Sequence, residues 1–181
     1  MKKAISGILM GLALIALSAS SPQAIIVHPT DEQVSRAIAY GERYKDNIEK
    51  IKKEYSYPEI KGDRDFVAVV SKISLIKLYS AIAAREGRKI SDQEVEKFVN
   101  MKAFFIKAYL VGNHPNFAKY IDGEIRIGRG PTAKTIQPIK VIKETWAVPT
   151  MSWPHPPSWK IANKYFFPYE QIKGNERIIF I

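Results

Sequence analysis

Apolar residues recur at every third or fourth position through the first half of the chain, which is the spacing of amphipathic helices. The first such stretch follows Thr30. There, Thr30 and Gln33 have the spacing of a capping box, in which each side chain satisfies a backbone amide of the other residue. Apolar positions then continue as far as Tyr55. The pattern predicts one amphipathic helix of about 22 residues.

The next apolar stretch differs from the first because polar residues form only a narrow stripe along it. Residues 66–84 are apolar on most sides, which is typical of a helix at the centre of a core. Lys72 and Lys77 near the middle argue against a membrane span, since each charge would be costly in lipid. We predict that this helix ends near Gly87, a residue that suits a helix C-terminus.

A second capping-box pattern opens the third predicted helix. Ser91 and Glu94 have the required spacing, and apolar residues follow at helical intervals. We expect this helix to end near Gly112. The connections between the three helices are short, so neighbouring helices should be antiparallel.

After His114 the helical spacing gives way to β-branched and aromatic runs that glycine and proline interrupt. Asp122-Gly123, between strand-like segments, is a typical hairpin signal. The chain ends on four apolar residues, Ile178–Ile181, which we interpret as a buried strand. Further strands are predicted within residues 136–147, 159–167 and 170–181.

Helices followed by strands indicate an α+β fold. We expect three N-terminal helices packed on one face of a mainly antiparallel sheet of about four strands. Residues 30–112 would form the helical half and residues 117–181 the strand-rich half. No linker long enough to divide them is present, so residues 25–181 are predicted to form a single globular domain.

Residues 1–24 have the layout of a secretory signal peptide. Two lysines precede an apolar run, Ala4–Leu17, and small residues follow it. The run has about 14 residues, fewer than the roughly 20 that a membrane-spanning helix needs. Cleavage after Ser20 or after Ala24 fits the pattern. The sequence therefore predicts a periplasmic or secreted protein, with an uncleaved N-terminal anchor, and membrane contact through it, as the alternative.

The chain contains no cysteine, which excludes disulfides, lipid attachment to a thiol and a cysteine nucleophile. The net charge is +10, and removing residues 1–24 with their two lysines lowers it to +8. A basic exported protein is expected to meet an anionic envelope component or partner protein rather than nucleic acid. Solubility alone also accounts for such a charge. The sequence leaves the oligomeric state open.

The segment between residues 146 and 159 holds all three tryptophans and is rich in proline. Prolines around Trp153 and His155 exclude a regular helix or a central strand, so we predict a stiff loop that fixes the indoles of Trp153 and Trp159. If exposed, these residues and Trp146 would form a recognition surface for a sugar, a peptide or a membrane interface. If buried, the indoles would close one end of the sheet.

A glycine-containing segment, Gly128–Lys134, is the second candidate site. It follows a predicted strand, and Arg129 and Lys134 could bind an anion together with exposed backbone amides. A dinucleotide-binding loop would need a helix and an acidic residue after it, and both are missing. A bend or a bulge explains the two glycines better than a nucleotide loop does.

Every histidine of the chain precedes a proline, which restricts the backbone of the preceding residue. His28, His114 and His155 are thus weak candidates for a metal site of the three-histidine type. They are far apart in the sequence and lack the close spacing of paired metal ligands. We therefore expect neither a metal nor a cofactor.

Catalytic signatures are weak in this chain. Asp63 with Asp65 and Asp122 with Glu124 are the best carboxylate pairs, but helix capping and turn chemistry account for them. No serine lies in a G-x-S-x-G motif. These features lean away from an enzyme.

The sequence as a whole favours an exported, non-enzymatic binding domain of the envelope or the extracellular space. The first alternative is a small exported hydrolase or anion-binding enzyme, with a site where Arg129, Lys134, Asp122 and His114 converge. The second alternative is a structural subunit of an envelope assembly that pairs through its last strand or a sheet edge.

Overall fold

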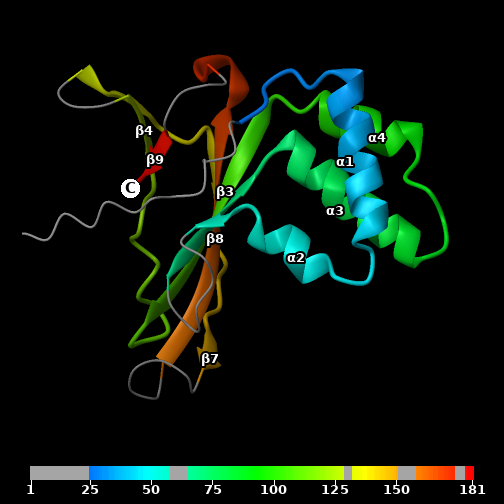
Figure 1. Ribbon diagram of the computed structural model, residues 1–181. Coiled ribbons are helices and arrows are strands. Elements are labelled where there is room, and N and C mark those ends of the chain that lie inside the picture. Colours follow the sequence, from blue (N-terminus) through cyan, green and yellow to red (C-terminus); the bar gives the residue numbers. More distant parts are fainter. Residues whose placement is uncertain (1–24, 58–64, 129–131, 151–157, 174–177) are drawn as a thin grey trace, which may run out of the picture.

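A large antiparallel sheet occupies the middle of the molecule, with helices on one side and a smaller sheet on the other (Figure 1). This computed structural model describes residues 25–57, 65–128, 132–150, 158–173 and 178–181. Every strand pairing within these residues is antiparallel. The structure thus confirms the predicted α+β fold, although the described residues form four α-helices and two sheets.

The strands of the large sheet lie in the order β1 (Ser56–Tyr57), β2 (Phe66–Val70), β3 (Ala103–Gly112), β8 (Ser158–Pro168) and β6 (Lys140–Ile142), and β7 (Val148–Thr150) pairs with the other end of β8. The small sheet has the order β5 (Lys134–Ile136), β4 (Ile125–Ile127) and β9 (Ile178–Phe180). The helices are α1 (Asp31–Arg43), α2 (Ile48–Lys53), α3 (Lys72–Arg85) and α4 (Asp92–Val99), and a short 3-10 helix, η2 (Tyr169–Gln171), follows β8.

The predicted helical half contains three strands of the large sheet, β1, β2 and β3, which corrects the prediction. Residues 66–84 divide into β2 and α3 at Ser71, which caps α3, and residues 91–112 divide into α4 and β3. A short apolar run bordering a helix reads as part of that helix, because periodicity alone does not separate a buried strand from a buried helix. The helix predicted to reach Tyr55 is also two helices, since Asn47 caps α2.

The strand-rich half also differs in detail. The predicted Asp122-Gly123 hairpin is wrong, because no described strand directly precedes β4. Gly123 is instead a site of close approach: a Cβ there would lie 2.5 Å from the Cζ atom of Phe180. The strand expected within 159–167 is confirmed as β8. The C-terminal strand is confirmed as β9, but it is only half-buried at the edge of the small sheet.

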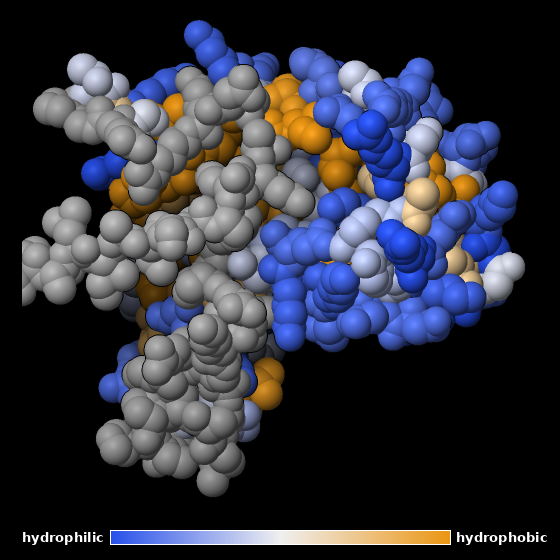
Figure 2. Space-filling view, viewed as in Figure 1, coloured by the Kyte–Doolittle hydropathy of each residue, from blue (hydrophilic) through white to orange (hydrophobic). Residues whose placement is uncertain are grey.

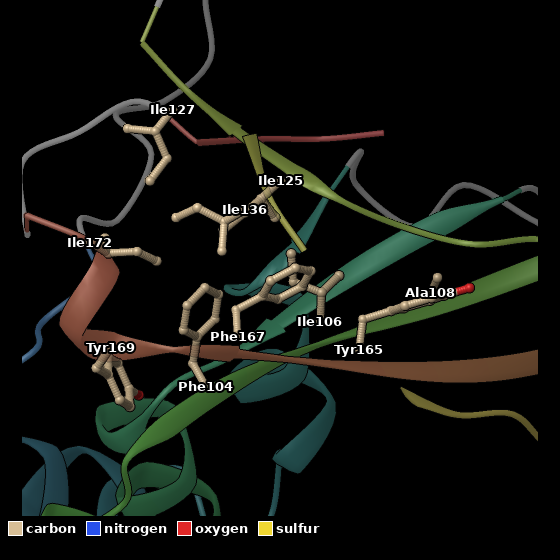
Figure 3. Close-up of a cluster of buried hydrophobic side chains, with 10 residues drawn as sticks. All are labelled: Phe104, Ile106, Ala108, Ile125, Ile127, Ile136, Tyr165, Phe167, Tyr169 and Ile172. Atoms are coloured by element: carbon tan, nitrogen blue, oxygen red, sulfur yellow. The ribbon is translucent and has the colours of Figure 1, made fainter. Parts of the chain in front are cut away.

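An apolar core fills the space between the two sheets (Figure 3). Side chains alternate between the two faces of a strand, so one face of the large sheet supplies this core. Ile25 and Val27, at the start of the described chain, pack against it. Its buried members are Phe104, Ile106, Ala108, Ile125, Ile127, Ile136, Tyr165, Phe167, Tyr169 and Ile172.

A second apolar core joins the helices, and hydrophilic side chains cover much of their outer surface (Figure 2). Its buried members are Ala37, Ile76, Ala83, Ile90 and Phe98. A polar contact adds to it: the Tyr40 hydroxyl donates to Glu54, and Nζ of Lys77 lies 3.0 Å from the other carboxylate oxygen of Glu54. These contacts link α1, α3 and the end of α2.

Tyr169 connects the helices to the sheets. Its hydroxyl accepts a hydrogen bond of 3.0 Å from the backbone N–H of Lys72, the first residue of α3, whose amide has no partner within the helix. The backbone N–H of Tyr169 donates to the carbonyl of Lys102 at 3.0 Å. The ring packs against Phe104, with centroids 5.5 Å apart. Burial raises the pKa of Tyr169 to about 12.

Helices α1 and α3 are in close contact at Gly41. A Cβ at this position would lie 2.3 Å from the Lys77 carbonyl oxygen and 2.7 Å from Cβ of Ser80. The first of these atoms belongs to the backbone of α3, so the helices would have to separate to accept a methyl group. Glycine at this position is therefore required by packing.

We expect Gly41→Ala to lower the free energy of unfolding by about 1–2 kcal/mol, because overpacking outweighs the gain in helix propensity. Urea denaturation of the variant tests this. Ser35→Ala, at an exposed position of the same helix, is the matched control and should change stability little. A more stable Gly41→Ala protein would mean that the helices separate without cost.

We expect Tyr169→Phe to lower the free energy of unfolding by about 1–2 kcal/mol, because the Lys72 amide loses its acceptor in a buried place. The wild type should also lose stability between pH 10 and about 12, since the folded protein holds the Tyr169 proton more tightly than the unfolded chain does. Below pH 10 this contribution is fully present. The loss from Tyr169 is at most about 1.4 kcal/mol per pH unit.

Urea denaturation across this pH range measures the effect. The alkaline loss should be shallower in Tyr169→Phe, whereas Tyr120→Phe, at a residue that is 80% exposed, should behave as the wild type. Equal alkaline slopes in the Tyr169→Phe and wild-type proteins would contradict the assignment.

Candidate functional site

The residues of the predicted recognition surface lie in different surroundings. Trp146 lies in the connection between β6 and β7 and is 83% exposed. Trp159 is half-buried near the start of β8, opposite Gly112 of β3 and Pro149 of β7. Trp153 and His155 lie outside the described residues. Trp146 is therefore the tryptophan that the described surface offers to a partner.

Trp146 belongs to a group of exposed apolar side chains along one edge of the large sheet. Val148 is 64% exposed and Ile139 is 63% exposed, which is unusual for large aliphatic residues. Ile142 and Val141 are also exposed. We call these five residues the apolar margin. Exposed apolar groups that gather in this way mark interaction sites more often than isolated ones do.

The connection that carries Trp146 is attached to β8 by a side chain. β6 pairs with residues 164–166 and β7 with residues 158–160, so the backbone between them is left without a strand partner. Glu144 fills this place, because its Oε2 atom accepts a hydrogen bond of 3.1 Å from the N–H of Ala162. Nζ of Lys143 also binds Oδ1 of Asp122 at 2.9 Å. Both contacts hold the backbone just before Trp146 in place.

The second candidate, Gly128–Lys134, connects β4 to β5 in the small sheet. Gly128 has a φ of 95°, a conformation that favours glycine and suits a bend. Lys134 is exposed and lies opposite Ile127. Arg129 lies outside the described residues. The described part of the loop is therefore explained by its role as a hairpin connection.

The histidines do not form a visible metal site. His28 and His114 are both exposed, and the ring of His114 contacts Phe117 edge-on. His155 lies outside the described residues. Within the part of the chain that the structure describes, no group of three His, Cys, Asp or Glu side chains could hold a metal ion.

The described members of the carboxylate pairs have structural partners. Oδ1 of Asp65 accepts a hydrogen bond of 2.7 Å from the Val111 amide. Asp122 pairs with Lys143, as described above, and Glu124 contacts Arg126 and accepts from Gln137. Asp63 lies outside the described residues. These contacts give each of the described carboxylates a structural role, so no catalytic role is needed to explain them.

Comparison with family models, curated proteins and solved structures finds no match to this chain. Function therefore has to be inferred from the chain's own residues. None of the helices in the described ranges is both long and apolar enough to cross a membrane.

Sequence patterns identified Trp146 but missed its apolar neighbours. Residues 136–147 predict a partly exposed strand, and exposure of Ile139 and Ile142 depends on β6 being the outer strand of its sheet. The available signal for an outer strand was a short apolar segment interrupted by proline and charged residues, because proline within a sheet is found mainly on edge strands.

We expect acrylamide to quench the fluorescence of Trp146 and to leave that of Trp159 largely shielded, as their exposures require. Trp146→Phe should remove a strongly quenched component of the emission, and Trp159→Phe should remove a shielded one. The matched pair differs only in which indole is lost. If Trp146→Phe leaves the quenching curve unchanged, Trp146 is covered in solution.

Proposed function

We propose that this chain is an exported, non-enzymatic binding domain that attaches to an anionic component of the cell envelope through the apolar margin. The observation that carries the proposal is the exposure of Trp146 together with Ile139 and Val148 on one sheet edge. An exposed indole offers a large and rigid contact area at a low cost in conformational entropy. Such residues dominate the binding energy of many interfaces.

Charge supports the choice of partner. Lys140 is exposed within β6 itself, and its Nζ lies 5.9 Å from the centroid of the Phe166 ring. The chain carries a net charge of +10, so its surface attracts polyanions. An apolar contact area beside lysines suits a partner that has both apolar and anionic groups.

The proposed location rests on residues 1–24. Their lysines, apolar run and small residues have the order of a signal peptide. Cleavage after Ala24 would make Ile25, which packs against the core, the first residue of the mature protein. Mass spectrometry of the accumulated protein should find an N-terminus at Ser21 or Ile25, and a full-length cytosolic product would contradict export.

Cosedimentation with an isolated envelope fraction tests the binding surface. The full chain should sediment with the fraction, and Trp146→Ser/Val148→Ser should bind at least roughly thirtyfold more weakly, since loss of a central tryptophan contact costs about 2 kcal/mol. Tyr120→Ser is the matched control, because Tyr120 is 80% exposed and lies outside the apolar margin.

Wild-type sedimentation of the Trp146→Ser/Val148→Ser protein would show that the apolar margin is not the contact surface. A concentration-dependent dimer that the same substitutions abolish, with no envelope binding, would instead favour self-assembly through this edge. That result would overturn the proposal.

A further inference from the structure

The face of the large sheet that points toward the helices carries two lysines directly opposite each other. Phe104 and Ile106 point into the core between the sheets, so Lys107 points to the opposite face. The register of β3 and β8 pairs Lys107 with Lys164. Ala68 and Ile142, on the strands to either side, continue the same row and carry no charge.

No ion pair joins Lys107 or Lys164 to a carboxylate among the described residues. Like charges directly opposite each other on neighbouring strands are destabilising. Both side chains are also half-buried, which reduces the screening of their repulsion by water. A bound anion would relieve the repulsion.

Aromatic rings border the lysine pair along both strands. Phe105 pairs with Phe166 on one side, with ring centroids 5.2 Å apart. Tyr109 lies on the other side and stacks on Phe66, with centroids 4.2 Å apart. Each aromatic row is two residues from the lysines, or about 6.7 Å along the strand. Nζ of Lys107 lies 4.4 Å from the Tyr109 ring centroid.

The surroundings leave one side of this surface open. Tyr55, directly after α2, lies beside β2: its carbonyl accepts from the Val69 amide, and burial raises its pKa to about 12. Toward β7 the sheet extends beyond the helices (Figure 1). The lysine pair thus lies between the covered β2 side and the exposed apolar margin on β6 and β7.

We propose that Lys107 and Lys164 form a binding site for the carboxylate groups of an acidic polysaccharide, and that Phe166 and Tyr109 contact the sugar rings beside them. Two ammonium groups on adjacent strands can bind one anionic group with charge-assisted hydrogen bonds. Apolar faces of sugar rings pack on aromatic side chains. The choice of a polysaccharide over single-stranded nucleic acid rests on the proposed function, since an exported protein meets the former.

Titration with polygalacturonate tests the site. The full chain should bind this polymer with an affinity that falls as salt is added. Lys107→Gln/Lys164→Gln keeps a polar side chain with part of the aliphatic stem and removes both charges, and we expect it to bind roughly tenfold or more weakly, with less dependence on salt. Lys89→Gln/Lys97→Gln removes two exposed charges, one from the α3–α4 connection and one from α4, and should bind within about twofold of the wild type.

Stability separates a binding role from a structural one. Because the substitutions remove a repulsion, Lys107→Gln/Lys164→Gln without ligand should have a urea midpoint equal to or above that of the wild type. Weaker binding by a protein that is no less stable supports the site. A lowered midpoint would mean that the lysines serve the fold, and would overturn the proposal.

Parallel titrations use oligothymidylate and uncharged dextran. Tighter binding of oligothymidylate than of polygalacturonate would assign the surface to nucleic acid. Binding of dextran as tight as that of polygalacturonate would show that charge plays no role. Either result overturns the proposal. The proposal is also overturned if Lys107→Gln/Lys164→Gln binds polygalacturonate as tightly as the wild type does, or if Lys89→Gln/Lys97→Gln loses as much affinity. Failure of the proposed function is separate, because it appears as unchanged envelope sedimentation of the Trp146→Ser/Val148→Ser protein.

Discussion

The hydrogen bond from the Lys72 amide to the Tyr169 hydroxyl joins two parts of the molecule that otherwise have separate cores. One core lies between the sheets and the other among the helices. Tyr169 belongs to the first core and caps the helix that forms the centre of the second. Tyr169 therefore helps to fix the orientation of the helices relative to the large sheet, together with Met101, which packs against both cores.

The alternation of side chains along a strand gives the two faces of the large sheet different roles. On β3, Phe104 and Ile106 are buried between the sheets, whereas the residues between them face the helices. Only the first face can be fully apolar without risk to solubility. The second face is half-buried, which permits aromatic and lysine side chains to share it, and this division creates the surface on which the polysaccharide proposal rests.

Local signals in the sequence were reliable where local chemistry decides the structure. The capping boxes at Thr30 and Ser91 are both present, and the apolar run at 159–167 is a strand. Residues 66–70 were misassigned because an apolar run bordering a helix fits either element. The pairing of Lys107 with Lys164 could not be predicted, since it depends on the register of strands about fifty residues apart.

Glu144 has a consequence for how the molecule meets copies of itself. Its carboxylate occupies the Ala162 amide at the place where the outer strand is interrupted. An incoming strand would find that donor already satisfied and a negative charge beside it. Charged interruptions of this kind protect sheet edges from uncontrolled pairing. Glu144 therefore closes the gap between β6 and β7 to strand pairing, beside the tryptophan and aliphatic side chains that this edge displays.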